Sequence, residues 1–346
     1  MLDRMFLQQS GEKISIADVF STSLYTGNGG SQNVTNGIKL NSKGGLVWLK
    51  QRGSGGNNPS HWLFDSARGS AYSLSTDEAG GQFGTWSPGV TFNSNGFNTG
   101  GHIQWNTNGV TYASWTFRKA PNFFDVVSYT GNGVSGRQIA HNLGSTPGCI
   151  IIKPTSVGGV PSGWSQPADW WVYHRGLPSP SNFSLRLNTS ASQNNSGGLV
   201  ATSTTFTVYG SSTASAIADN VNGVQYIAYL FAHDTASTGL VQCGSYSAQV
   251  GSEVPVYLGW QPQFVIIKKA TLSESAVNEN WMMFDTVRGI TMAADQILKA
   301  NNTDTETAAD HLDLTATGFT VSATSFYATN YPEGAQYNYI AIRGAT

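Results

Sequence analysis

The chain has 346 residues, a formal net charge of −2 at pH 7 and only 11% charged side chains. This length allows two or three ordinary domains, and the low charge excludes the basic surface of a nucleic-acid-binding protein. No apolar stretch reaches the roughly 18–20 residues of a membrane span, so we expect no membrane insertion. The 40 glycines, many in Asn-Gly and Gly-Gly pairs, are typical of hairpin turns. Together with short β-branched and aromatic runs, they favour an all-β fold.

Residues 1–19 precede any repeated pattern, and we expect them to form a separate N-terminal arm. Apolar and polar residues alternate there too quickly for the core of a signal peptide, which indicates a protein made in a cytoplasm and not exported by the usual route. Cys149 and Cys243 lie far apart in strand-like runs. This placement favours two buried thiols over a disulfide.

A short Gly-rich motif occurs in three versions, at Leu24–Gly29, Ser128–Gly133 and, in decayed form, Gly244–Ser247. Each version leads to an apolar run that ends in Lys: Leu46–Lys50, Cys149–Lys153 and Phe264–Lys268. A segment that begins with Trp follows, at Trp62, Trp170 and Trp281. The spacing of the copies is far longer than that of solenoid repeats, so each copy is predicted to be a whole domain. The predicted domains are residues 20–120, 121–235 and 236–346.

Short strands separated by Gly, Asn and Ser turns predict a β-sandwich or jelly-roll-like domain of about 100 residues in each copy. The runs that end in Lys are expected to be inner strands buried on both faces. Three further strands are expected around Phe97, Phe206 and Phe319. In the second and third copies apolar and polar residues alternate, which predicts strands with one solvent-exposed face. One helix is predicted over Thr291–Leu298, followed by a loop over Asn301–Asp313. Short junctions between the domains predict either a stiff rod or a compact trefoil.

Several sequence patterns fit a chemical site only loosely. Gly131–Gly136 has the spacing of a dinucleotide-binding turn, but no helical period follows it, so a hairpin turn is favoured. The histidines are not paired at metal-ligand spacing. The carboxylates Asp304, Glu306, Asp310 and Asp313 lack the order of a calcium loop, and a solvated loop is favoured. We therefore expect no enzyme, no cofactor and no bound metal.

The repeated Trp–Asp–Arg constellation allows two interpretations. The aromatic rings would be stacking platforms for a sugar, with the charged residues as its hydrogen-bonding partners. Alternatively, these residues recur because the fold needs them, and this interpretation is favoured because positions shared by every copy usually encode structure. The candidate ligand-binding residues are Trp62, Asp65, Arg68, Trp170, Tyr173, Arg175, Trp281, Asp285 and Arg288. Ligand specificity would then lie in the segments that differ, 52–60, 156–168 and 271–280.

Several strings of the chain, in one order, resemble a family of repeat-bearing virion proteins of tailed bacteriophages, found especially in phages of marine bacteria and cyanobacteria. They include Leu63–Gly69, Ile139–Gly144, Pro147–Lys153 and Trp170–Arg175, and the resemblance extends from Met1–Phe6 to Tyr339–Arg343. The resemblance implies a tail-fibre or minor tail component and supplies no catalytic residues. By analogy with phage fibres it also implies a homo-oligomer, with a trimer expected.

The expected function is that of a non-enzymatic structural protein of a phage virion, a tail-fibre or tail-tip adhesin that serves in host attachment. It would be assembled in the host cytoplasm, joined to other virion proteins through the arm 1–19, and directed at a host-surface glycan or protein. The alternative is a capsid or tail decoration, a cement protein that contacts only other virion subunits. A third hypothesis, a glycan-degrading depolymerase, requires two close carboxylates in a cleft.

Overall fold

Strands form nearly all of the regular secondary structure, so the fold is all-β, as predicted. The computed structural model describes residues 14–345 except 58, 88, 157–168, 196, 210–217, 272–278, 292–293 and 326–329. Within these ranges there are two short helical segments, the 3-10 helix η1 (Ile16–Asp18) and the α-helix α1 (Ile103–Asn106). No helix of the described part is long and apolar enough to cross a membrane.

The strands fall into three sets along the chain, which we call the first, second and third units. The first unit contains β1 (Phe20–Thr26), β2 (Asn33–Val34), β3 (Gly45–Gln51), β4 (His61–Asp65), β5 (Thr91–Asn93), β6 (Gly96–Asn98) and β7 (Thr111–Arg118). The second contains β8 (Phe124–Thr130), β9 (Arg137–Ala140), β10 (Cys149–Pro154), β11 (Trp171–His174), β12 (Leu185–Arg186), β13 (Val200–Ala201), β14 (Thr205–Val208) and β15 (Gln225–Phe231). The third contains β16 (Val241–Ser247), β17 (Val254–Tyr257), β18 (Pro262–Lys269), β19 (Met282–Asp285), β20 (Asp295–Lys299), β21 (Thr307–Ala309), β22 (Leu312–Thr315), β23 (Gly318–Val321) and β24 (Gln336–Arg343).

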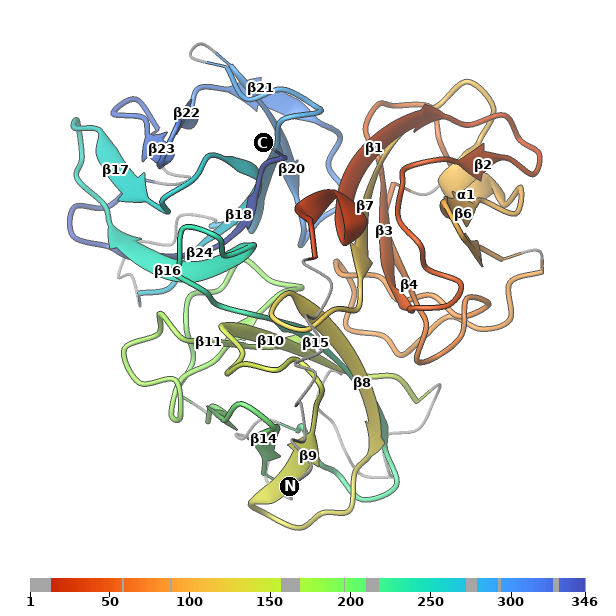
Figure 1. The fold of residues 1–346 in the computed structure, drawn as a ribbon, viewed down its shortest axis with the longest axis horizontal. Coiled ribbons are helices and arrows are strands. Elements are labelled where there is room, and N and C mark those ends of the chain that lie inside the picture. Colours follow the sequence, from red (N-terminus) through yellow and green to blue (C-terminus); the bar gives the residue numbers. More distant parts are fainter. Residues whose placement is uncertain are drawn as a thin grey trace, which may run out of the picture.

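Each unit is a sandwich of one large antiparallel sheet and one three-stranded sheet (Figure 1). The large sheets have the orders β1-β7-β3-β4, β8-β15-β10-β11-β12 and β16-β24-β18-β19-β20-β21. The small sheets have the orders β2-β6-β5, β9-β14-β13 and β17-β23-β22. In every large sheet the last strand of the unit lies between its first strand and the inner strand that ends in Lys. Whether the units fold as three separate domains stays a prediction.

The inner strand β3 is buried along its whole length because both of its faces meet apolar layers. Leu46 and Trp48 point into a cluster shared by all three units, which we call the central cluster. Val47 and Leu49 point the other way, into the core between the two sheets of the first unit. The strands β10 and β18 are divided in the same manner between the central cluster and their own unit. The prediction of inner strands buried on both faces is confirmed.

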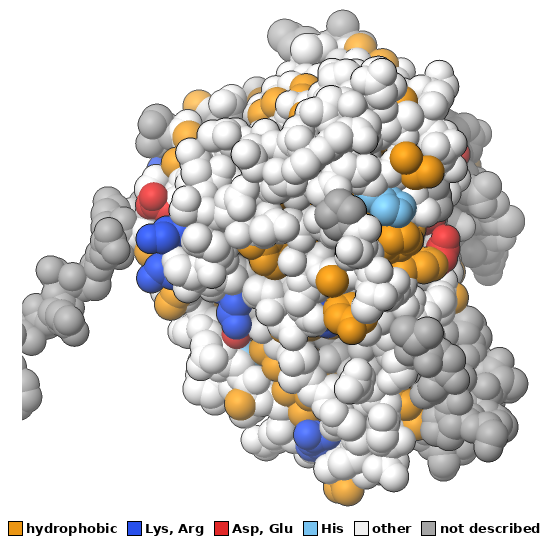
Figure 2. All heavy atoms as spheres, turned by 90° about the vertical axis from the view of Figure 1, so that its right-hand side faces the viewer, with side chains coloured by type: hydrophobic (Ala, Val, Ile, Leu, Met, Phe, Trp, Pro, Cys, Tyr) orange, Lys and Arg blue, Asp and Glu red, His pale blue; other side chains and the backbone are white. Residues whose placement is uncertain are grey.

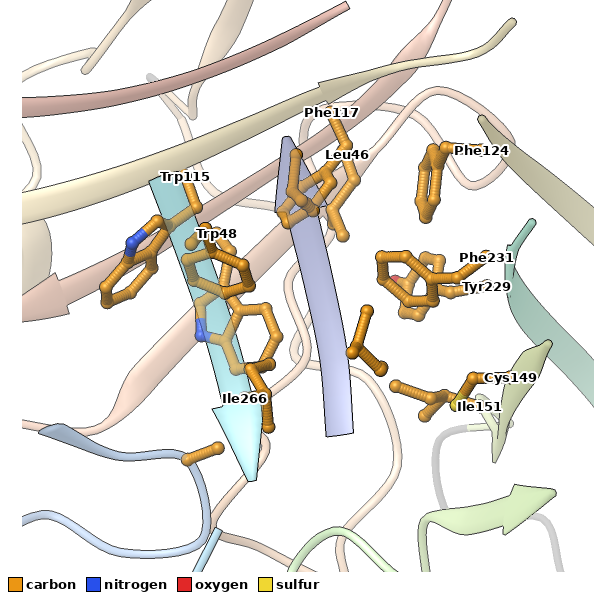
Figure 3. Close-up of a cluster of buried hydrophobic side chains, with 14 of the residues drawn as sticks. Leu46, Trp48, Trp115, Phe117, Phe124, Cys149, Ile151, Tyr229, Phe231 and Ile266 are labelled. Carbon is orange, nitrogen blue, oxygen red and sulfur yellow. The ribbon is translucent and has the colours of Figure 1, made fainter. Parts of the chain in front are cut away.

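The central cluster lies where the three large sheets face one another (Figure 3). It draws Trp48 from the first unit, Cys149 from the second, and Cys243 and Ile266 from the third. Figure 1 shows the units as three lobes around this centre, an arrangement that matches the trefoil and not the rod. Both cysteines are free thiols, as predicted.

The helix predicted over Thr291–Leu298 is wrong, because the described part of this segment contains the strand β20. Its Gln, Leu and Lys residues are good helix formers, but pairing with β19 and β21 outweighs local propensity. The buried carboxylate of Asp295 also accepts the backbone N–H groups of His311 and Leu312, which fastens the start of the strand. The loop predicted over Asn301–Asp313 likewise contains β21 and the beginning of β22.

Only residues 14–19 of the predicted arm belong to the described part of the chain. Ser15 caps η1, and the side chains of Ile16 and Val19 are buried in the central cluster. The end of the arm is therefore anchored in the body of the protein. The remainder, residues 1–13, lies outside the described residues.

The molecular surface carries few charges. Figure 2 shows one face on which basic and acidic side chains are sparse and hydrophobic side chains are scattered. Among the described residues, the exposed large apolar side chains are far apart in sequence and are Leu24, Ile103, Val134, Val200, Tyr257 and Val287. Single apolar side chains on a surface are ordinary and do not define an interface.

Candidate functional site

The three tryptophans of the repeated segment are buried. Trp62 lies in the core of the first unit, whereas Trp170 and Trp281 lie in the central cluster, and none is more than 2% exposed. Their rings offer no free face on which a sugar could stack. This burial favours the interpretation in which the aromatic residues recur because the fold needs them.

Strand register shows that these tryptophans do not occupy equivalent places. Equivalent residues of the inner strands pair with Trp62, Trp171 and Met282. The first-unit counterpart of Trp170 and Trp281 is therefore His61, one residue before Trp62. Matching Trp62 to the other two tryptophans, as the sequence suggests, places it one residue out of register.

His61, Trp170 and Trp281 make the same contact at three junctions. Each ring N–H faces a backbone carbonyl of a neighbouring unit, that of Lys299 (2.9 Å), Ser75 (2.8 Å) and Arg186 (2.9 Å), respectively. The first unit thus bonds to the third, the second to the first, and the third to the second. These contacts close the three units into a ring, which we call the junction ring.

The hydrogen bonds of His61 fix its neutral form. The indole Nε1 of Trp48 donates to His61 Nδ1 at 2.8 Å, so the ring proton is on Nε2, facing the Lys299 carbonyl. Burial, and then the charge of Lys50, hold the pKa of His61 well below its usual value. The imidazole is therefore a structural link and not an acid–base group near neutral pH.

The first candidate ion pair, Asp65–Arg68, ties the first unit to the second. Arg68 Nε lies 2.6 Å from Asp65 Oδ2, and the hydroxyl of Tyr229 on β15 donates to the same oxygen at 2.8 Å. Arg68 Nη2 donates to the carbonyl of Leu63 at 3.1 Å. Because Asp65 is fully buried, its charge needs these partners, and the pair supports the fold.

The second ion pair, Asp285–Arg288, ties the third unit to the first. Arg288 Nε lies 2.5 Å from Asp285 Oδ2, and the indole Nε1 of Trp115 on β7 donates to that oxygen at 3.0 Å. Trp115 and Tyr229 occupy equivalent places, opposite the inner strands β3 and β10. The repeated Asp–Arg pair thus meets an aromatic donor from the next unit at both junctions.

The middle copy departs from this pattern for a physical reason. His174 occupies the place of Asp65 and Asp285 in the strand register. On β24 the place of the aromatic donor is taken by Ile340, which has no donor, so a buried carboxylate would lack that partner. His174 instead donates from Nε2 to the Tyr339 carbonyl at 3.0 Å. The three turns therefore complete the junction ring with different chemistry.

The other two candidate residues of the middle copy, Tyr173 and Arg175, take no part in the hydrogen bond between His174 and the third unit. Tyr173 packs in the core of the second unit and is 8% exposed. Arg175 is exposed and its Nη1 contacts Nε2 of His233. Burial, together with the Arg175 charge, lowers the pKa of His233 to about 4.

Three lysines next to the ends of the inner strands also link neighbouring units. Each ammonium donates to a backbone carbonyl of a neighbouring unit: Lys50 to Thr303 (3.2 Å), Lys153 to Glu78 (3.3 Å) and Lys268 to Ser190 (2.7 Å). Burial lowers the pKa of Lys50 to about 8, and those of Lys153 and Lys268 to about 7.

Two of the four acidic residues of the predicted solvated loop, Asp304 and Glu306, pair with cations of the chain itself, whereas Asp310 accepts the hydroxyl groups of Ser322 and Thr324. Asp304 lies 2.7 Å from Lys299, and Glu306 lies 2.6 Å from Arg52 and 3.2 Å from Arg288. Across the residues that the structure describes, no group of three His, Cys, Asp or Glu side chains could hold a metal ion.

A cavity of ≈520 Å³ opens where the first unit meets the second. It is lined by Ala67, Arg68, Tyr72, Gln82, Ser128, Tyr129, Thr130, Thr155, Gln225 and Tyr226. Most of these side chains carry hydroxyl, amide or guanidinium groups, so the cavity suits a polar ligand. We take it as the candidate functional site and call it the junction cavity.

Of the nine candidate residues, Arg68 lines the junction cavity. The other lining residues come from separate segments of two units. Ala67 and Ser128–Thr130 belong to repeated strings of the sequence, but nothing in the sequence indicates that these segments meet. Strand register across the junction would have been needed to find them. The divergent segments 156–168 and 271–280 lie largely outside the described residues, so they remain predictions as specificity loops.

Comparison with known proteins gives a family but no activity. A family model described as a domain of unknown function (DUF7483) matches residues 15–345. No curated protein matches the chain. The match spans all three units, whereas the chemistry of the junction cavity has to be argued from its geometry.

Proposed function

The chain belongs to the DUF7483 domain family, and we propose that it is a non-enzymatic structural protein of a tailed-phage virion. In this role it is a tail-fibre or tail-tip adhesin that contacts the host surface. The assignment to a virion rests on the strings of the sequence that resemble repeat-bearing virion proteins of tailed phages. An all-β body with a low surface charge suits this role. Exposed ion pairs weaken as the salt concentration increases, so a surface with few of them loses little stability in salt water.

The junction ring is the observation that carries the structural role. Residue types that often perform catalysis, such as His61, His174 and Lys153, are buried and hydrogen-bonded to backbone carbonyls of a neighbouring unit. Asp65 and Asp285 are buried in ion pairs and are likewise held by a neighbouring unit. These side chains are used to hold the units together, which supports a rigid binding or structural part over an enzyme.

The junction cavity favours an adhesin over a decoration protein. A protein that only cements virion subunits needs no polar hollow between its units. An adhesin needs a site that accepts hydroxyl-rich surface groups, and the lining of Ser128, Thr130 and Gln225 offers hydroxyl and amide partners. The contacts of Arg68 with Asp65 and of Asp65 with Tyr229, which tie the two units together next to the cavity, would hold these partners in place before binding.

Binding of the purified chain to host cells tests the proposal. We expect a fluorescently labelled chain to bind the cells saturably, and added host surface polysaccharide to reduce this binding. A chain that is incorporated into particles but does not bind cells would instead indicate a decoration protein. Release of shorter saccharides from the polysaccharide would overturn the non-enzymatic assignment.

A further inference from the structure

The three junctions contain the same niche with three different sets of side chains. Equivalent backbone hydrogen bonds define it: Gln82 N to Thr155 O (3.2 Å), Gln193 N to Ala270 O (2.9 Å) and Glu306 N to Arg52 O (2.8 Å). The third member of each niche is the residue three positions after the turn residue Asp65, His174 or Asp285, namely Arg68, Leu177 and Arg288. The three niches thus consist of Arg68, Gln82 and Thr155 between the first and second units, Leu177, Gln193 and Ala270 between the second and third, and Arg288, Glu306 and Arg52 between the third and first.

Between the third and first units, the niche is filled by charge. The Glu306 carboxylate bridges Arg288 Nη1 at 3.2 Å and Arg52 Nη2 at 2.6 Å. Arg288 simultaneously pairs with Asp285, so one guanidinium here serves two carboxylates. Guanidinium groups have five N–H donors, which makes this double pairing possible.

Between the second and third units, the niche is closed by apolar residues. Leu177 is 4% exposed and Ala270 is fully buried, so neither leaves a charge to be satisfied. Gln193 is buried at the same junction, and its Oε1, like that of Gln82, has no partner among the described residues. This version contains no guanidinium, so it offers no positive charge with which a carboxylate could pair.

Between the first and second units, the niche is the junction cavity. Arg68 keeps the pairing with Asp65, but its Nη1 has no hydrogen-bond partner among the described residues, and the side chain is only 5% exposed. Gln82 takes the place of Glu306, and its Oε1 is also without a partner. Thr155 takes the place of Arg52. Both Arg68 and Gln82 line the cavity. Gln82 carries a neutral amide, so the negative charge that Glu306 supplies elsewhere is missing here, and the unpartnered Oε1 can accept from a hydroxyl group of a ligand.

We propose that the junction cavity binds a carboxylate-bearing saccharide, whose carboxylate takes the place of the Glu306 carboxylate next to Arg68. The proposal deepens the adhesin function and rests on it for the biological source of the sugar. A saccharide is favoured over an acidic peptide because the remaining lining, Ser128, Thr130 and Gln225, offers partners for several hydroxyl groups. Tyr72 adds an aromatic ring at the wall of the cavity.

The chain itself suggests a variant that separates binding from folding. Gln82→Glu restores the carboxylate of the filled niche, which should pair with Arg68 and leave the fold intact. The matched control is Gln138→Glu, which adds the same carboxylate at an exposed position of β9 outside the cavity lining. Thr155→Arg restores the second guanidinium and should tighten binding of a carboxylate. Titration calorimetry with glucuronate, glucose and acetate, together with a thermal melt of each variant, measures the effects.

We expect the wild-type chain to bind glucuronate, with glucose and acetate weaker by about tenfold or more, the scale of one charge-assisted hydrogen bond. Gln82→Glu should lose binding by about tenfold or more, Gln138→Glu should retain it, and Thr155→Arg should strengthen it. Equal binding of glucuronate by Gln82→Glu and wild type would overturn the proposal. Acetate or a Glu-containing peptide binding as tightly as glucuronate would overturn the saccharide assignment.

The two experiments can reject the proposed ligand and the adhesin function independently. Host-cell binding without any glucuronate binding would reject the ligand and leave the adhesin. Glucuronate binding that depends on Gln82, in a chain that does not attach to cells, would support the cavity and reject the adhesin.

Discussion

At the scale of single residues, the junction ring depends on side chains held in one protonation state. His174 shows this most clearly, because its Nε2 donates to Tyr339 and its Nδ1 accepts the Gly176 N–H at 3.0 Å. A second proton on Nδ1 would point at the Gly176 N–H, so protonation would replace this hydrogen bond with a repulsive contact. Burial accordingly lowers the pKa of His174 to about 4.

This lowered pKa makes the protein sensitive to acid. Below about pH 6.5 the unfolded chain takes up a proton on this histidine, whereas the folded chain does not until about pH 4. The contribution is therefore complete above pH 6.5 and is lost as the pH falls towards 4. For His174 the loss between pH 7 and pH 5 should be about 2 kcal/mol of unfolding free energy.

The variant His174→Gln tests this pH dependence. Glutamine keeps an N–H donor for the Tyr339 carbonyl but does not titrate, so the difference in stability between pH 7 and pH 5 should shrink by about 2 kcal/mol. Urea unfolding followed by tryptophan fluorescence measures it. His102→Gln, at a partly exposed ring outside the junction ring, is the control and should leave most of the difference. An unchanged difference in His174→Gln would show that this imidazole is not kept neutral.

At the scale of elements, the sequence predicts what depends on a local pattern. The runs Leu46–Lys50 and Cys149–Lys153 read as inner strands because strands buried on both faces are continuously apolar. β20 was missed because its residues favour a helix locally and become a strand only through their neighbours. The junction cavity was missed for the same reason, since its lining is assembled by contacts between units. Arg68 was named from the sequence as part of the repeated Asp–Arg turn. Ser128–Thr130 also belong to a repeated motif, but nothing in the sequence indicates that this motif meets Arg68.

The N-terminal segment gives a prediction at this scale. Ile16 and Val19 pack in the central cluster, so a deletion that tests docking to the particle must stop before them. Removing residues 2–13 should leave the melting temperature unchanged and abolish incorporation into virions. Circular dichroism and immunoblots of purified particles measure the two effects. Normal incorporation of the shortened chain would assign docking to another part of the protein, and a lowered melting temperature would show that residues 2–13 support the fold.

At the scale of the whole molecule, the central cluster joins what the sequence presents as separate copies. Each large sheet contributes one face to the cluster and the other to its own sandwich. A unit on its own would therefore expose a broad apolar face to water, with an unfavourable free energy of about 25 cal/mol for each Å² of apolar surface. It would also leave buried groups such as Asp65 and His174 without their partners from the next unit.

We therefore expect the three units to unfold together. Tryptophan fluorescence and far-ultraviolet circular dichroism should give coincident transitions in urea, because loss of one unit removes two of the three junctions. A chain that ends at residue 235 lacks the third unit and leaves part of the central cluster uncovered. This shortened chain should bind a hydrophobic dye and unfold without a cooperative transition. The full chain should not bind the dye and should unfold cooperatively. If the shortened chain unfolds cooperatively with little dye binding, the units are autonomous domains and the central cluster contributes little to their stability.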